Sequence, residues 1–324
     1  MLFCGFLLYN AVMRLLENTP RFNIEAAVKI AAESFGIQAT AQPLPSERDQ
    51  NFLLTNSADE KFVLKIANAL ETWEFLDAQN AALNHVGKHV DFCQSLVPGI
   101  NGEEIVTVDG YFVRVVRYLP GVPLAEIHHP PSELLRDLGR KLGQLAQALK
   151  DFDHPAVHRY FHWDLPNGNE IIDEYSPLIE NAGLRDVVVR CKVDFDERLR
   201  RSAIHGDAND YNVLVDPQRM TVSGLLDFGD MVYSYTAGEL AIAVAYVVLD
   251  KPHPRAVAHE VIEGYTSEFA LLDEEREAVW PLALLRLAVS ACMAAYQQRQ
   301  QPENEYLRIS QRAIEENLPR IFTE

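Results

Sequence analysis

The chain has 324 residues, of which 48% are apolar and 23% are charged. This is the composition of a globular protein, and it excludes collagen-like, coiled-coil and wholly disordered chains. Acidic residues outnumber basic ones by 47 to 29, which gives a formal net charge of −18. Because binding to nucleic acid or to an anionic membrane needs clustered Lys and Arg, we expect neither as a partner. Such a charge can instead attract a cationic small molecule.

The cysteines and the N-terminal residues indicate the cellular compartment of the protein. The four cysteines lie far apart without a CxxC pair, so we expect reduced thiols in a cytoplasmic protein rather than a zinc site or a disulfide framework. Residues 1–12 are apolar, but no basic residue precedes the run and no small-residue cleavage site follows it. We interpret them as a disordered extension or the product of an upstream start codon, with a weak signal or anchor as the alternative. No other stretch is a candidate membrane span.

The first part of the chain predicts an antiparallel sheet with two helices. One helix spans 23–35 with Asn23 as its cap, and the other spans 71–86. Their expected buried faces are Ile24, Val28, Ala31 and Phe35, and Trp73, Leu76, Leu83 and Val86. The strand-like runs are 39–43, 51–55, 62–66, 105–108 and 111–117. Residues 56–59 and the dipeptide Asp109-Gly110 predict hairpin turns.

A connector with two prolines and a glycine follows at 118–123. Beyond it the chain predicts mainly helices, the first of them capped by Ser132. The helical runs are 132–149, 184–201, 237–249, 256–269, 274–297 and 303–317, and the strand-like runs among them are 212–215 and 222–226. We therefore expect four parts: an extension at 1–12, a sheet-rich lobe at 13–117, a hinge at 118–123 and a helical lobe at 124–324.

Two segments of the helical part carry candidate chemistry: 205–212 (HGDANDYN) and 224–230 (GLLDFGD). Phosphoryl transfer needs a carboxylate that accepts or orients a hydroxyl proton, and oxygen ligands that hold Mg²⁺ on the nucleotide phosphates. Asp207 suits the first role, and Asn212 and Asp227 suit the second. The alternative is that these residues only form turns and caps, but both motifs in this order favour a kinase.

The motifs HGDxxxxN and LDFG together resemble the signature of the aminoglycoside phosphotransferase family, which contains small-molecule kinases. Softer matches resemble its hydroxylysine-kinase-like branch: PLPSERDQNFLL, FVLKIAN, FHWDLPN and MVYSYTAGELAIAVAYVVL. The resemblance spans about Met13 to Leu249. It implies an α+β, bilobal protein-kinase-like fold, with a small antiparallel-sheet N-lobe, a larger and mainly helical C-lobe, and a nucleotide between them.

Carried to this sequence, the resemblance implies catalytic roles for four residues. Asp207 is the catalytic base, and His205 holds the catalytic loop as a structural hydrogen-bonding residue. Asn212 and Asp227 bind Mg²⁺. The phosphoryl donor is ATP or GTP, and the branch is associated with GTP.

The resemblance also implies that Lys65 contacts the α- and β-phosphates of the nucleotide. Its acidic partner is expected on the helix 71–86, where Asp77 is favoured by position and Glu74 is the alternative. Taken alone, Lys65 is an isolated charge in a buried strand, and it could instead extend to solvent at a sheet edge.

No GxGxxG motif lies between the first strands, so a polar loop takes the place of the phosphate loop. Ser46, Arg48 and Asn51 could donate hydrogen bonds to phosphate there, and a solvated hairpin tip is the equal alternative. The nucleotide base would be received by the backbone of the hinge residues Arg117, Tyr118 and Leu119.

Candidate substrate residues follow from side-chain chemistry. Trp163 and Asp164 place an aromatic ring beside a carboxylate, which suits an ammonium group, although a core tryptophan with a capping aspartate is the alternative. Asp230 could meet the substrate or a cation. Tyr233 and Glu239 could line the substrate side, while Glu239 could instead stabilise a helix N-terminus.

The sequence therefore predicts a kinase for a small, possibly cationic alcohol, and the branch resemblance makes 5-hydroxylysine the first candidate. The alternatives are another alcohol acceptor (homoserine, choline, a sugar or an aminoglycoside) and a catalytically silent nucleotide-binding protein. A protein kinase is disfavoured because the glycine-rich loop and an APE-like segment are missing.

Overall fold

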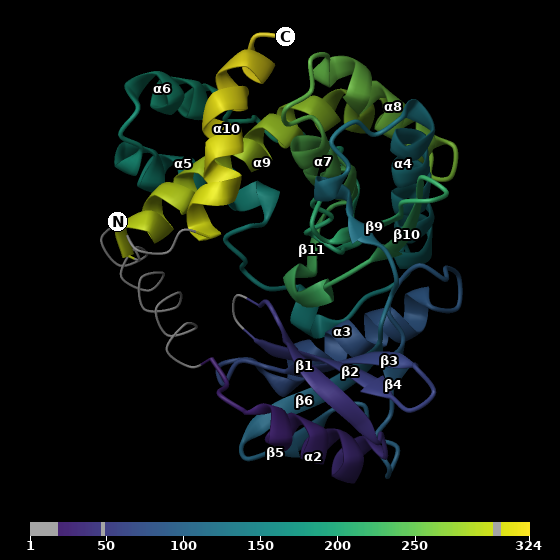
Figure 1. The fold of residues 1–324 in the computed structure, drawn as a ribbon. Helices are drawn as coiled ribbons and strands as arrows, with labels where there is room; N and C mark the ends of the chain where they lie inside the picture. The colour runs from purple at the N-terminus through teal and green to yellow at the C-terminus, as the bar shows by residue number, and fades with distance from the viewer. Residues whose placement is uncertain (1–18, 47–48, 301–305) are drawn as a thin grey trace. The chain divides into compact units, whose positions relative to one another are not determined.

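The computed structural model describes residues 19–46, 49–300 and 306–324. These form two compact units, one that ends at Leu119 and one that begins at Pro120 (Figure 1). The expected α+β class is confirmed, with an antiparallel sheet in the first unit and mainly helices in the second. The expected extension at 1–12 and the candidate residue Arg48 lie outside the described residues.

The N-terminal unit is built on one antiparallel sheet in the order β1-β2-β3-β6-β4, with β5 paired to β6. Both predicted hairpins form, and Asp59 and Asp109 adopt the left-handed conformation that such turns favour (φ 61° and 50°). The strands are β1 (Ala39–Leu44), β2 (Gln50–Asn56), β3 (Lys61–Ile66), β4 (Leu96–Val97), β5 (Val106–Val108) and β6 (Tyr111–Arg117).

Helices α2 (Ile24–Phe35) and α3 (Trp73–Val86) cover opposite faces of this sheet (Figure 1). The buried side chains of α2 pack with those of β1, β2, β3 and β6, including Val113 and Val115. Arg114 lies between these two valines, so it points to the other face, where α3 binds it. Ile24 and Trp73 are 47% and 48% exposed, so their predicted burial is wrong. Each is the first residue of its helix, where the turn still projects beyond the packed surface.

The C-terminal unit contains two small antiparallel sheets, β10-β9-β7 and β11-β8. Their strands are β7 (Val122–Pro123), β8 (Arg201–Ile204), β9 (Val213–Asp216), β10 (Thr221–Leu225) and β11 (Val232–Tyr235). The predicted helix over 184–201 is wrong at its end. It stops at Arg190, and Arg201–Ile204 instead pairs with β11. Tertiary strand pairing thus overrides the local helical pattern.

The helices of this unit are α4 (Ser132–Leu149), α5 (Gly168–Tyr175), α6 (Ala182–Arg190), α7 (Thr236–Val247), α8 (Pro254–Thr266), α9 (Asp273–Gln300) and α10 (Tyr306–Phe322). The sequence did not predict α5. Ser132 is the first residue of α4 rather than its cap, because Pro131 occupies the cap position without a side-chain hydrogen bond. The predicted apolar stripe of α4 is buried: Leu135, Leu138, Leu142 and Leu145.

Helix α9 is the core helix of the C-terminal unit and packs against α5, α7 and α10. By length and composition, Asp273–Arg299 is also apolar enough to cross a membrane, with a mean hydropathy of 1.7 over its most apolar window. The expectation that no stretch beyond residues 1–12 is a candidate span is therefore wrong. Of its most apolar window, 78% is buried inside the structure. That burial fits a core helix of a folded unit.

Candidate active site

The segment that joins β8 to β9 forms a tight loop that carries the first motif. Strand β8 ends at Ile204 and β9 begins at Val213, so residues 205–212 lie between them. Gly206 has φ +83°, and a Cβ atom there would lie 2.6 Å from the backbone oxygen of Asp230. Only glycine therefore lets this loop approach the second motif so closely.

His205 and Glu239 fix the start of the loop. The His205 ring is fully buried, and its Nδ1 accepts the N–H of Asp207 at 3.2 Å. The proton is therefore on Nε2, which donates to the carbonyl of Leu226 at 2.8 Å and so joins the two motifs. Glu239, in α7, accepts the N–H groups of His205 and Gly206 and is only 2% exposed. This burial corrects the expectation that Glu239 lines the substrate side.

The carboxylate of Asp207 is held on both oxygens. Oδ1 accepts Nη2 of Arg286 at 2.9 Å, and Oδ2 accepts the side-chain amides of Asn209 and Asn212 at 3.0 and 2.8 Å. Burial raises the pKa of Asp207 to about 8, the negative charge of Asp230 adds to this, and Arg286 opposes it. The arrangement orients one carboxylate while leaving one lone pair, on Oδ1, for a hydroxyl.

Asn212 and Asp227 offer hard oxygen donors that fit Mg²⁺. The Nδ2 group of Asn212 is committed to Asp207, so its Oδ1 is the atom left to face a cation. Asp227 adopts a left-handed backbone conformation (φ 62°), and its Oδ1 accepts the N–H of Gly229 at 3.0 Å. No group of three or more His, Cys, Asp or Glu side chains suited to a metal occurs among the described residues.

Trp163, Asp164 and Asp230 come together with Gly206 at a closely packed contact that has no space for a water molecule. Ser234 donates its hydroxyl proton to Asp164, and burial raises the pKa of Asp164 to about 6. Two of the predicted substrate carboxylates thus lie beside the start of the loop at 205–212, without an open cavity between them.

The Trp163 ring already contacts a cation of the chain itself. The guanidinium of Arg286 lies over this ring at 4.7 Å from its centroid. The predicted contact of Trp163 with a substrate ammonium stays a prediction. Tyr233 is half-buried and stacks on the ring of His158 at 4.3 Å. It is not among the residues that surround the contact of Trp163, Asp164, Asp230 and Gly206.

In the N-terminal unit, Asn51, Lys65 and Arg114 form a row across β2, β3 and β6, since each lies directly opposite the next in register. Directly opposed residues share a face of the sheet, so Lys65 lies on the α3 side with Arg114. Arg114 is held there by the side chains of Gln79 and Asn80. The Oδ1 atom of Asn51 is buried and has no hydrogen-bond partner among the described residues, so this polar face has capacity for a ligand.

The two candidate acids on α3 differ in position. Asp77 is half-buried and lies one turn before Asn80, which contacts Arg114, whereas Glu74 is exposed. This geometry favours Asp77 as the partner of Lys65.

The remaining predicted nucleotide contacts are peripheral. Ser46 and Arg117 are exposed, and Leu119 is half-buried. The N–H groups of Arg117 and Tyr118 donate to the carbonyls of Ser95 and Lys61. These two hinge N–H groups are therefore used within the N-terminal unit.

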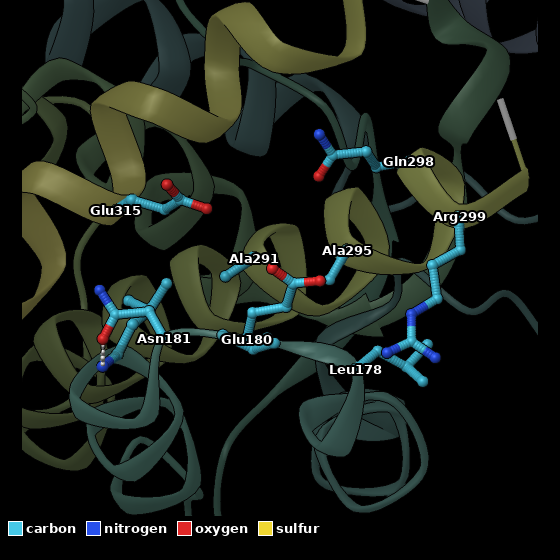
Figure 2. Close-up of a pocket in the computed structure, with 10 residues that line it drawn as sticks. Leu178, Glu180, Asn181, Ala291, Ala295, Gln298, Arg299 and Glu315 are labelled. Carbon is cyan, nitrogen blue, oxygen red and sulfur yellow. Dashed lines mark hydrogen bonds between the residues drawn. The ribbon is translucent and has the colours of Figure 1, made fainter. Parts of the chain in front are cut away.

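A separate cavity of about 620 Å³ opens in the C-terminal unit among α6, α9 and α10 (Figure 2). Its lining includes Glu180, Arg299 and the small side chains of Ala291 and Ala295. At about 3.6 residues per turn, these alanines lie across α9 from Arg286. The cavity is thus on the side of the helix away from Asp207, and none of the sequence-predicted site residues lines it.

Sequence analysis missed Arg286, Asn209 and Ser234, which contact the predicted residues directly. Asn209 lies within the first motif, HGDxxxxN, at one of the positions for which the motif requires no particular residue. Arg286 had a signal of its own, because it is the sole charged residue between Glu277 and Arg299 in an apolar helix. Nothing local connects it to a loop that lies 79 residues away in sequence.

The two-unit fold, together with one hydrogen-bonded site made from both motifs, defines a kinase-like phosphotransferase. The chain belongs to the phosphotransferase enzyme family, which matches residues 40–279. It is therefore an enzyme that transfers phosphate to an alcohol group of a small molecule.

The chain is 32% identical to a hydroxylysine kinase of Mus musculus, over 94% of this chain and 90% of that protein. It is 30% identical to a hydroxylysine kinase of Danio rerio, over 94% of this chain and 93% of that protein. An amicoumacin kinase solved with AMP-PNP and Ca²⁺ has the same fold, with a TM-score of 0.69, 15% identity, and coverage of 91% of this chain and 94% of that one.

Proposed function

We propose that this enzyme transfers the γ-phosphoryl group of Mg-ATP or Mg-GTP to the hydroxyl of an amino alcohol or a hydroxy amino acid, with 5-hydroxylysine as the first candidate. The observation that carries the proposal is the Asp207 carboxylate, held by Arg286, Asn209 and Asn212 where the two motifs meet. The two hydroxylysine kinases similar to this chain support the choice of acceptor.

In this proposal, Asp207 accepts a hydrogen bond from the acceptor hydroxyl and takes its proton as the oxygen attacks the γ-phosphorus. The bond between that phosphorus and the β-phosphate oxygen breaks, and the nucleoside diphosphate leaves. Asn212 and Asp227 supply oxygen ligands for Mg²⁺. The bound Mg²⁺ neutralises charge on the phosphate oxygens. Lys65 binds the donor phosphates, with Asp77 as its acidic partner.

The acceptor is proposed to be cationic. Asp164 and Asp230 lie beside Gly206, close to the start of the loop at 205–212. They would pair with an ammonium group and so orient the hydroxyl toward Asp207. The net charge of −18 agrees with such a ligand. A cytoplasmic location also belongs to the proposal, supported by the buried thiols of Cys191 and Cys292.

The test is phosphate transfer from ATP and from GTP to hydroxylysine, ethanolamine, homoserine, choline, simple sugars and kanamycin. Asp207→Asn is the inactive variant, and Asp186→Asn, which alters an exposed carboxylate on α6, is its control. We expect transfer to an amino acceptor that disappears only in Asp207→Asn. Transfer solely to a sugar or to kanamycin would refute the acceptor class. Mg-nucleotide binding without any transfer would point to a silent binding protein.

A further inference from the structure

Arg286 is the one charged side chain in the long apolar middle of α9, and it is only 2% exposed. A guanidinium in such surroundings is strongly unfavourable unless a carboxylate and further acceptors surround it. The partners that meet this requirement are all parts of the candidate active site or of the helix behind it.

The guanidinium joins three segments that are far apart in sequence. Nη2 donates to Oδ1 of Asp207 at 2.9 Å, and Nη1 donates to the carbonyl of Trp163 at 3.0 Å. Nε donates to the hydroxyl of Tyr246 in α7 at 3.2 Å, and Tyr246 in turn contacts Ser290, one turn further along α9. The planar group is thus fixed at its base by α7 and α9, while its two terminal nitrogens face the active-site segments.

We propose that Arg286 is a positioning residue for phosphoryl transfer. It sets the orientation of the Asp207 carboxylate and links it to the Trp163–Asp164 segment. This inference rests on the proposed function of Asp207 as the base.

Arg286 can position Asp207 because it supplies a hydrogen bond that the other partners of this carboxylate do not supply. Asn209 and Asn212 hold Oδ2, and Arg286 alone among the hydrogen-bond donors of the described residues holds Oδ1. Without Arg286 the carboxylate can rotate about its remaining partners, and the Trp163 carbonyl loses its donor. A displacement of about 1 Å in a reacting group costs about 100-fold in rate. A lysine would restore the charge but not the planar fork that reaches both partners.

The chain offers a control in Arg200, which is more exposed than Arg286 but likewise pairs with a carboxylate, here one on α9. Arg200 pairs with the buried carboxylate of Glu275, donates to the carbonyl of Ala270 and lies 5.0 Å from the ring of Phe269. Its contacts do not include the catalytic loop. Loss of Arg200 therefore reports what removal of a paired arginine does to stability alone.

The experiment measures kcat, the KM of the nucleotide and the melting temperature for Arg286→Met, Arg286→Lys and Arg200→Met. We expect Arg286→Met to lose about 100-fold in kcat with the nucleotide KM within about threefold of wild type. Arg286→Lys should recover part of this loss. Arg200→Met should melt at a lower temperature and keep its kcat. Unchanged kcat in Arg286→Met, or an equal loss in Arg200→Met, would overturn the inference.

A second measurement is independent of the acceptor. A double-mutant cycle on unfolding, with Asp207→Asn and Arg286→Met, should be strongly non-additive because the two side chains interact directly. Additive effects would remove the pairing on which the inference depends. A wild-type enzyme that transfers no phosphate, or an active Asp207→Asn variant, would count against the proposed function instead, and the two failures are thereby distinguished.

Discussion

The carboxylate of Glu239 accepts the backbone N–H of His205 at 2.6 Å, with both residues buried. The same Oε2 atom accepts the N–H of Gly206 at 3.1 Å. Helix α7 therefore holds the first two residues of the catalytic loop through one side chain. This arrangement makes Glu239 part of the support of the loop.

Replacement of Glu239 by alanine should leave two buried N–H groups without an acceptor. We expect Glu239→Ala to lower the free energy of unfolding by roughly 2 to 4 kcal/mol, and Glu239→Gln to lower it less, because its amide oxygen still accepts. Urea denaturation measures both. Glu33→Ala, which removes an exposed i,i+4 partner of Lys29, is the control and should change stability by less than about 0.5 kcal/mol. Equal stability of Glu239→Ala and wild type would contradict the supporting role.

Asp164 should make stability depend on pH. Its pKa is raised to about 6 because burial outweighs the Ser234 hydrogen bond and the charges of Arg201 and Arg159. An acid whose pKa rises on folding holds its proton more tightly in the native state. Stability is therefore lost as the pH rises from about 4 to about 6, and the loss persists above that range.

Asp164→Asn cannot ionise and still offers Ser234 an acceptor. Its free energy of unfolding should match that of wild type near pH 4 and exceed it by roughly 2 to 3 kcal/mol near pH 7. Denaturation at both pH values checks this, with Asp186→Asn as the control for a general change of charge. A difference that is the same at pH 4 and pH 7 would disprove the assignment to Asp164.

Loss of a proposed metal ligand should raise the requirement for Mg²⁺. We expect Asn212→Ala and Asp227→Asn to need at least about tenfold more Mg²⁺ for half-maximal rate. The readout is a Mg²⁺ titration of the transfer rate. Asp216→Asn is the control, because that carboxylate accepts the N–H groups of the turn between β9 and β10. An unchanged Mg²⁺ requirement in both variants would exclude these residues as ligands.

Mutation of the two acids on α3 should have different effects on the kinetics of the nucleotide. Because Asp77 is half-buried and Glu74 is exposed, Asp77→Asn should reduce kcat/KM for the nucleotide by about 10- to 100-fold. Glu74→Gln should stay within about twofold of wild type, and Lys65→Met should show at least the loss of Asp77→Asn. Steady-state kinetics at fixed acceptor concentration decide between them. A larger effect at Glu74 would assign the ion pair to that residue.

The sequence predicted what local patterns determine. The hairpins follow from turn residues between alternating runs, and the motif residues Asp207 and Asn212 come together because they lie in one short loop. The sequence-based prediction failed where contacts with residues far away in the sequence determine the structure. The segment 201–204 is a strand only because β11 pairs with it. Arg286 is part of the site only because α9 passes beside a loop 79 residues away in sequence.

Burial of the α9 guanidinium is strongly unfavourable unless it meets a carboxylate, and Asp207 supplies that carboxylate. We therefore expect docking of α9 and closure of the loop at 205–212 to be coupled, with Asp207 stabilising the fold as well as serving as the proposed base. Native-state hydrogen exchange should accordingly report one shared opening of the helix and the loop.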